Sequence, residues 1–326
     1  MAEPRHVTLV AATISAALGV GMQAHAQTAP QFPSKPVRLV VGFSPGSQSD
    51  ILARILGPKL SETWRQPVII ENRPGATGQI GASIVAKASP DGHTLLFTSA
   101  SFVINAALQS SLPYDPLKDF AGVTQLGFTT GVLVVSPALG ARSVRDLVAL
   151  AQQRPGKLIF GSTGVGSNTH LSGETFRMAA GVQVTHVGFK GQPEFLIEIM
   201  AGRIHFAVPG LASALPLIKD GRLLPLAVGT PQRSPVLPGV PTIAEVLPKY
   251  EKDGSYALLA PARTPRPVLQ GISKDVARAL ADREVLEKLN AIGFIPAPTT
   301  PEEHDQILRA QINTFSGVVR LIGLRQ

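Results

Sequence analysis

Short apolar runs alternate with helical patterns over the first part of the chain. The first run, at residues 37–41, is β-branched, lies between Pro36 and Gly42, and predicts a buried strand. A glycine loop follows, and apolar positions from Ile51 to Leu60 then recur at helical spacing behind Ser49 as the expected N-cap. Two further strands are expected at residues 68–70 and 94–97, with a helix at about 80–88 between them. This order is typical of a wound α/β layer with a parallel sheet.

The same order returns in the second part of the chain. Ser143 and Asp146 predict the start of a helix. The expected strands are 132–135, 158–160, 204–208 and 223–228, and a glycine-rich loop leads into a helix at about 169–178. Residues 233–248 hold four prolines and are expected to be an extended connection. Near the C-terminus, Thr300 and Glu303 form a predicted capping box.

Composition supports two folded domains and excludes several kinds of chemistry. The 326 residues are 44% hydrophobic and only 16% charged, which is unlike a disordered chain. Without cysteine, the chain has no disulfide, no thiolate metal site and no cysteine nucleophile. The net charge of +8 favours negatively charged partners through long-range attraction.

The N-terminus has the features of an export signal. Residues 7–21 carry no charge and precede Ala24-His25-Ala26, a small-x-small cleavage pattern. We therefore expect a signal peptide at residues 1–26, cleavage after Ala26 and a mature chain in the periplasm. The uncharged run is shorter than the roughly 20 residues that cross a bilayer.

Two glycine-rich loops are candidate anion sites, because each joins a predicted strand to a helix N-terminus, where unpaired amides and the helix dipole favour negative charge. The candidate ligand-binding residues of the first loop are Phe43, Ser44, Gly46, Ser47, Ser49 and Asp50. Those of the second loop are Gly164, Gly166, Ser167, Asn168, Thr169 and His170. Ser99 and Ala100 are added because they follow the strand expected at 94–97, and Lys190 and Gly191 because they precede a helix expected to begin near Pro193. Both pairs are expected at the C-terminal ends of strands, where α/β clefts bind ligands. Ordinary capped βα turns remain the alternative for both loops.

Enzymatic and cofactor alternatives find less support. Gly42 to Gly46 matches the G-x-S-x-G turn of α/β hydrolases, with Ser44 as nucleophile. The next residue, Pro45, has no amide for an oxyanion hole, so we expect no enzyme. Neither loop matches a nucleotide-binding fingerprint, and no residue spacing suits a metal, so no cofactor or metal is expected. Scattered basic residues and few aromatics argue against nucleic acid.

Several motifs together resemble one family, the Bug-type, TctC-like solute receptors of tripartite tricarboxylate transporters. The matching segments follow one another through nearly all of the expected mature chain, at residues 32–50, 71–78, 89–96, 112–120, 161–171, 190–191, 233–235 and 238–242. The resemblance implies a type II periplasmic binding protein with two α/β lobes around a ligand cleft. It implies a discontinuous first lobe, residues 27–123 plus 245–326, and a second lobe, 124–244.

Family members typically hold small carboxylates, such as dicarboxylates, citrate-like acids, acidic amino acids or aromatic acids, with amides and hydroxyls of the two loops. The chain departs from the family where Ser47 replaces a usual glycine and where Gln48 is expected to narrow the entrance or add a polar contact. The leading hypothesis is a monomeric receptor that delivers its ligand to a membrane permease. A hydrolase using Ser44 and a permease-less sensor receptor are the alternatives.

Overall fold

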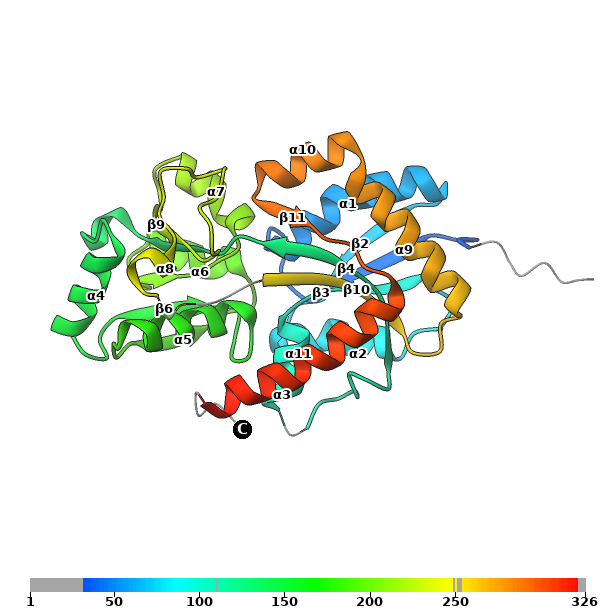
Figure 1. Cartoon of the computed structure of the whole chain (residues 1–326), viewed down its shortest axis with the longest axis horizontal. Coiled ribbons are helices and arrows are strands. Elements are labelled where there is room, and N and C mark those ends of the chain that lie inside the picture. The colour runs from blue at the N-terminus through cyan, green and yellow to red at the C-terminus, as the bar shows by residue number, and fades with distance from the viewer. Residues whose placement is uncertain (1–31, 110, 249, 251–253, 322–326) are drawn as a thin grey trace, which may run out of the picture. The chain divides into compact units, whose positions relative to one another are not determined.

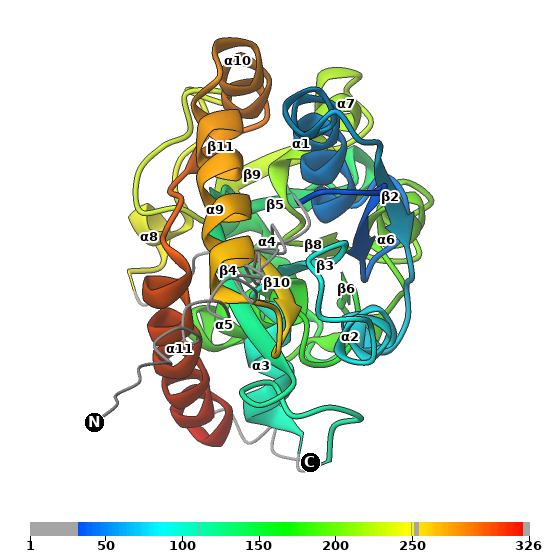
Figure 2. The same cartoon turned by 90° about the vertical axis from the view of Figure 1, so that its right-hand side faces the viewer.

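A computed structural model describes residues 32–321, except 110, 249 and 251–253. The expected signal peptide and its cleavage site lie outside the described residues. The described chain forms two β-sheets covered by helices (Figures 1 and 2). Among the described residues, no helix is long and apolar enough to cross a membrane.

The larger sheet has six strands in the order β11-β4-β10-β3-β1-β2. Its strands are β1 (Val37–Val41), β2 (Val68–Asn72), β3 (Thr94–Ser99), β4 (Phe120–Thr129), β10 (Gly254–Pro261) and β11 (Phe294–Pro296). β1 pairs in parallel with β2 and β3, as the strand–helix alternation predicted, whereas β10 is antiparallel to β3 and β4.

Helices cover both faces of the larger sheet because successive strand residues point to opposite sides. Leu39 of β1 packs in the core with α1 and α9, while the next residue, Val40, packs in the core with α2, α3 and α11. These helices and their neighbours are α1 (Gln48–Trp64), α2 (Gln79–Ala86), α3 (Ser101–Leu108), α9 (Arg266–Ala281), α10 (Arg283–Ala291) and α11 (Pro301–Leu321), with a 3-10 turn η1 (Ala76–Gly78). Thr300 and Glu303 make the predicted capping box at the start of α11.

The smaller sheet has five strands in the order β7-β6-β8-β5-β9. Its strands are β5 (Val132–Val135), β6 (Ile159–Ser162), β7 (Thr185–Gly188), β8 (Phe206–Ala207) and β9 (Leu224–Val228). The covering helices are α4 (Val144–Gln153), α5 (Asn168–Ala180), α6 (Gln192–Met200), α7 (Leu211–Lys219) and α8 (Ile243–Val246), with a 3-10 turn η2 (Pro137–Leu139). Two apolar cores, one on each face, hold this sheet.

The chain passes between the sheets twice, after β4 and again before β10. We call residues 32–129 and 254–321 the first lobe, and residues 130–248 the second lobe. β4 runs past the boundary expected at residue 123, because its pairing with β10 continues to Thr129. The expected proline-rich connection is extended except at α8, where Thr242 and Glu245 form a capping box.

Candidate functional site

A cavity lies between the lobes where helix N-termini from both lobes converge. Its wall includes residues from the first turns of α1, α3, α5 and α6 and the residue before α7. The lining residues are Phe43, Ser47, Ser49, Ser99, Ser101, Thr129, Gly131, Thr163, Asn168, Thr169, Ser172, Gln192, Val208, Pro209, Gly210, Gly229, Tyr250, Gly254 and Tyr256. None of these residues is charged, and the described wall therefore offers hydroxyls, amides and helix dipoles instead of cationic side chains.

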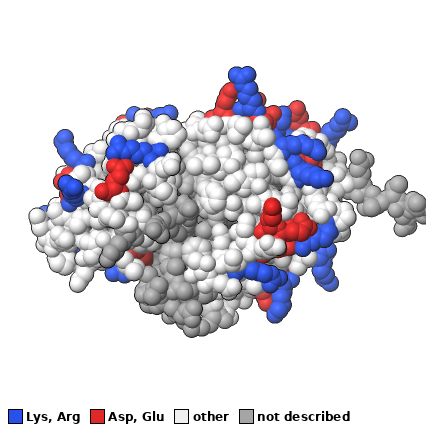
Figure 3. Space-filling model, viewed as in Figure 1, with Lys and Arg blue, Asp and Glu red and all other residues white. Residues whose placement is uncertain are grey.

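The cavity is small in this structure, with a volume of about 30 Å³. One ordered water needs roughly 10–15 Å³ by the same measure, so the space holds about two waters. An acid of several carbons therefore requires the lobes or lining side chains to move apart. On the face shown in Figure 3, the charged side chains lie mainly toward the outer parts and few lie in the middle.

The first loop folds as a turn ahead of α1. Ser47, and not the predicted Ser49, is the N-cap, because its extended backbone lets its hydroxyl accept the Asp50 amide at 3.4 Å. Gly46 has a φ of 77°, in the left-handed region that favours glycine. The Ser47 amide donates to the Ser44 carbonyl at 3.1 Å, which closes the turn.

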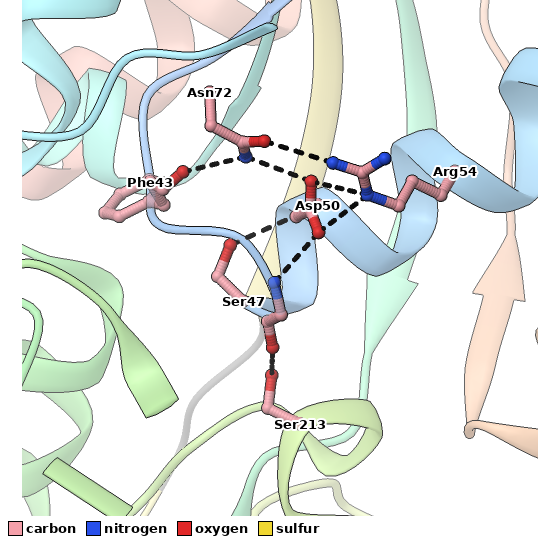
Figure 4. A network of polar contacts seen from close by, with 7 residues as sticks. Phe43, Ser47, Asp50, Arg54, Asn72 and Ser213 are labelled. Carbon is pink, nitrogen blue, oxygen red and sulfur yellow. Dashed lines mark hydrogen bonds and ion pairs between the residues drawn. The ribbon is translucent and has the colours of Figure 1, made fainter. Parts of the chain in front are cut away.

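Asp50 anchors this loop from behind (Figure 4). Its carboxylate accepts the Gly46 amide at 2.8 Å, Arg54 Nε at 3.0 Å and Asn72 Nδ2 at 3.0 Å. Asn72 also donates to the Phe43 carbonyl at 3.0 Å. Burial opposes ionisation, but the bonds from Arg54, the Gly46 amide and Asn72 hold the pKa of Asp50 below its usual value. Asp50 therefore shapes the loop and does not line the cavity.

The second loop repeats this geometry with different chemistry. Ser167 caps α5 by accepting the His170 amide at 3.0 Å, and Gly166 has a φ of 82°. The Ser167 amide donates to the Gly164 carbonyl at 3.1 Å. The Gly166 amide donates to His170 Nδ1 at 3.3 Å, as the Gly46 amide does to Asp50.

His170 is a buried, neutral support for that loop. It is 2% exposed, and burial lowers its pKa to about 4. Its ring lies 4.1 Å from the ring of His186, whose Nε2 is 2.6 Å from the Ser162 hydroxyl. Burial first, and the neighbouring His170 second, lower the pKa of His186 to about 4 as well. The pair is therefore uncharged at neutral pH.

Most loop amides already have protein partners, which narrows the expected ligand contacts at residues 46–50 and 164–169. The amides of Gly46, Ser47 and Asp50 are bonded within the loop, and that of Asn168 donates to the Ser101 hydroxyl at 3.0 Å. Within these two stretches of the described chain, the amides of Gln48, Ser49, Val165 and Thr169 have no hydrogen-bond partner. Val165 is exposed in the turn, whereas the other three belong to the first turns of α1 and α5, where amides lack an acceptor within the helix.

The cavity wall contains some of the predicted residues and not others. Those that line it are Phe43, Ser47, Ser49, Ser99, Asn168 and Thr169. Those that are described but do not line it are Ser44, Gly46, Asp50, Ala100, Gly164, Gly166, Ser167, His170, Lys190 and Gly191. Gly46, Asp50, Gly164, Gly166, Ser167 and His170 shape the turns behind the wall, whereas Lys190 is exposed.

Sequence reasoning missed lining residues that come from distant parts of the chain. Gln192 directly follows the predicted Lys190-Gly191 and is the first residue of α6. Its position at a helix start could therefore have identified it as a candidate lining residue. Thr129 lies where β4 ends, and its buried hydroxyl has no hydrogen-bond partner in the described part of the chain. Tyr250 and Gly254 lie on the return between the lobes and carry no local motif.

The lobes touch directly around the cavity. Ser44 Oγ lies 2.6 Å from Glu194 Oε1, and the Ser213 hydroxyl donates to the Gly46 carbonyl at 3.2 Å. The Thr77 hydroxyl donates to the Val165 carbonyl at 3.1 Å. These contacts, with the Asn168–Ser101 bond, describe a closed arrangement of the two lobes.

The arrangement does not favour a hydrolase. Ser44 hydrogen-bonds to a carboxylate, and in the described part of the chain no histidine bonds to its hydroxyl. Pro45, which follows it, has no amide to stabilise an oxyanion. No group of three or more His, Asp or Glu suited to a metal occurs among the described residues.

Comparisons with known proteins agree on one family. The family described as tripartite tricarboxylate transporter family receptor matches residues 52–324. Protein BugT of Bordetella pertussis is 32% identical over 301 residues, covering 91% of this chain and 92% of that protein.

Solved structures share the fold. One described as an R. palustris protein with adipate has a TM-score of 0.86 and 35% identity, covering 90% of this chain and 98% of that chain. MatC from Rhodopseudomonas palustris with bound malate has a TM-score of 0.82 and 28% identity, covering 88% of this chain and 100% of that chain.

Proposed function

The chain belongs to the tripartite tricarboxylate transporter receptor family, and from that premise we propose that it captures a small organic carboxylate between its lobes in the periplasm. The bound acid is then delivered to the membrane permease of a tripartite transporter. The convergence of helix N-termini on an uncharged cavity carries this proposal. Two relatives in the same fold are described with adipate and with malate, both dicarboxylates.

The recognition step uses backbone amides. One carboxylate accepts the amide of Ser49 at α1, and a second oxygen group accepts the Thr169 amide at α5. Hydroxyls of Ser101 and Thr129 complete the donor set. A neutral wall suits a receptor that must release its ligand, because no cationic side chain is left unpaired when the acid leaves.

Closure of the lobes follows from this geometry. The amides of α1 and α5 belong to different lobes, so one ligand satisfies both only when the lobes are together. The passage from β4 into β5, at residues 130–131, is the proposed hinge. We propose that the protein works as a monomer and that the permease recognises its closed conformation.

Binding assays test the proposal directly. Thermal shift and calorimetry on the purified chain are expected to detect at least one acid in a panel of four- to six-carbon dicarboxylates, with the matching diamides as neutral controls. The diamides are expected to bind at least tenfold more weakly, because helix dipoles favour negative charge. Equal binding of acids and diamides, or no response to any acid, contradicts the proposal.

A further inference from the structure

Gln48 reaches from one lobe into the other. It is the first residue of α1, and its side chain is fully buried, with 0% exposure. Its Oε1 accepts the amide of Ala212, in the first turn of α7, at 2.9 Å. The neighbouring contact, from Ser213 to the Gly46 carbonyl, is seen in Figure 4, where the start of α1 lies beside the α7 segment.

The side chain packs against the cavity wall at Gly210. A Cβ at Gly210 would lie 2.5 Å from Gln48 Oε1 and 2.9 Å from Gln48 Cγ, so a larger residue at this position would require the glutamine side chain to shift. Gln192 approaches the same residue and accepts the Gly210 amide at 3.2 Å with its Oε1. Two glutamine carbonyls therefore hold two amides at the start of α7.

These contacts make α7 different from α1 and α5. The α7 helix spans Leu211–Lys219 and points its N-terminus at the wall that Gly210 forms. A carboxamide oxygen of Gln48 occupies the position where a carboxylate oxygen would bind an N-terminal amide. Gln48 Nε2 is also buried and has no hydrogen-bond partner among the described residues. Burying an unpaired donor costs free energy, so the contact of Oε1 with α7 is kept despite that cost.

We propose that Gln48 is a specificity-determining residue that fills a carboxylate position at the N-terminus of α7. It restricts the receptor to acids that lack a carboxylate on that side of the cavity. This inference rests on the proposed carboxylate-binding function. Shortening the side chain frees the Ala212 amide and enlarges the cavity, and an additional ligand carboxylate then takes the place of the amide oxygen.

Glutarate and tricarballylate form a matched pair for the test, because the second acid is the first with one added carboxyl group. Calorimetry at one pH and ionic strength measures both affinities for the wild type, Gln48→Ala and Gln48→Glu. The wild type is expected to favour glutarate. Gln48→Ala is expected to shift the affinity ratio toward tricarballylate by at least tenfold.

Gln48→Glu keeps the shape of the side chain and places a carboxylate at α7. It is expected to fold like the wild type and to favour glutarate at least as strongly, because its own charge repels the added carboxylate. Gln79→Ala is the matched control, since Gln79 is also the first residue of a helix, α2, but among the described residues makes no hydrogen bond to the start of α7. Its affinity ratio is expected to equal that of the wild type.

The outcomes separate the two proposals. If the wild type binds acids but the ratio is unchanged in Gln48→Ala, or if the wild type already favours tricarballylate, this inference is overturned and the proposed function stands. If no acid binds the wild type, both are overturned. If Gln48→Ala does not fold, Gln48→Glu decides: a ratio shifted toward tricarballylate contradicts the inference, and a ratio held or shifted toward glutarate supports it.

Discussion

The two loops that face each other across the cavity have the same backbone design and opposite chemical supports. In each, a glycine with positive φ precedes a serine N-cap, and the glycine amide donates to the side chain four residues later. That side chain is the ionised Asp50 in the first loop and the neutral His170 in the second. The same turn at a helix start thus forms with either a carboxylate or an imidazole, provided that a buried acceptor for the glycine amide is present.

The largest expected effect comes from removing the charged support. Asp50→Ala leaves the Gly46 amide, Asn72 and Arg54 without their acceptor, and we expect the free energy of unfolding to fall by about 3 kcal/mol. Urea denaturation at pH 7 measures it.

Asp146 provides a matched control. It also follows a serine N-cap by three residues and accepts the amide four residues before it, that of Arg142, but on the exposed surface of α4. Asp146→Ala is expected to lower the free energy of unfolding much less than Asp50→Ala, because water solvates the exposed Arg142 amide once the carboxylate is removed. Equal losses in the two variants would show that burial of the Asp50 network adds nothing.

The second expected effect separates the loops by pH. The pKa of His170 is about 4 when folded and 6.5 in its ordinary state, so the unfolded chain takes up the proton first. Its contribution to stability is complete above pH 6.5, declines as the pH falls from 6.5 to 4, and falls no further below. The pKa of Asp50 lies below its usual value, so Asp50 stays ionised over this window.

His170→Asn isolates that effect, because asparagine supplies an acceptor without titrating. Between pH 7 and pH 5, the wild type is expected to lose about 2 kcal/mol more unfolding free energy than the variant. Urea denaturation at both pH values measures the difference. The same pH dependence of the unfolding free energy in both proteins would show that groups other than His170 cause it.

A smaller effect is expected at the contact between the lobes. Ser101→Ala removes the acceptor for the Asn168 amide together with a proposed ligand donor, and a loss of about 1 kcal/mol corresponds to roughly fivefold weaker ligand binding. Ser213→Ala removes a more exposed bond to the Gly46 carbonyl and is expected to change affinity less than twofold. Calorimetry with the same acid compares the two. A larger effect of Ser213→Ala would show that the contact between the lobes that matters most for affinity lies outside the cavity wall.

The smallest expected effect is that of salt on the first loop. Arg54 is about half exposed, with 54% of its side chain accessible, so its pairing with Asp50 is partly screened. Arg54→Gln is expected to lower unfolding free energy by about 0.5 kcal/mol at low salt and by less at high salt. Denaturation at two salt concentrations checks this; a loss that persists at high salt would indicate packing instead of charge.

Local patterns located seven of the eleven described strands, but not β4, β7, β10 and β11. The β-branched run at residues 37–41 became a buried strand, and the Ser143 cap formed with the Asp146 amide as predicted. The cap of α1 was misplaced, because Ser47 and Ser49 are equally good capping types and only the backbone conformation of Ser47 decides. The strand expected at 204–208 was shortened to Phe206–Ala207 because its pairing with β5 and β6 covers only those residues.

The site was less accessible to sequence reasoning than the fold. The two glycine loops carry a local signal, since glycine, serine and a following helix pattern lie together in the chain. Lining residues such as Thr129, Tyr250 and Gly254 meet them only through the passages between the sheets. The fully buried Gln48 gives no local sign that its partner is an amide 164 positions away.

The most direct test of amide recognition is a crystal structure of the protein with the acid that binds best. We expect carboxylate oxygens within hydrogen-bonding distance of the amides of Ser49 and Thr169, with no lysine or arginine side chain touching the ligand. A ligand held by a cationic side chain, or bound outside the space between the lobes, would contradict amide recognition.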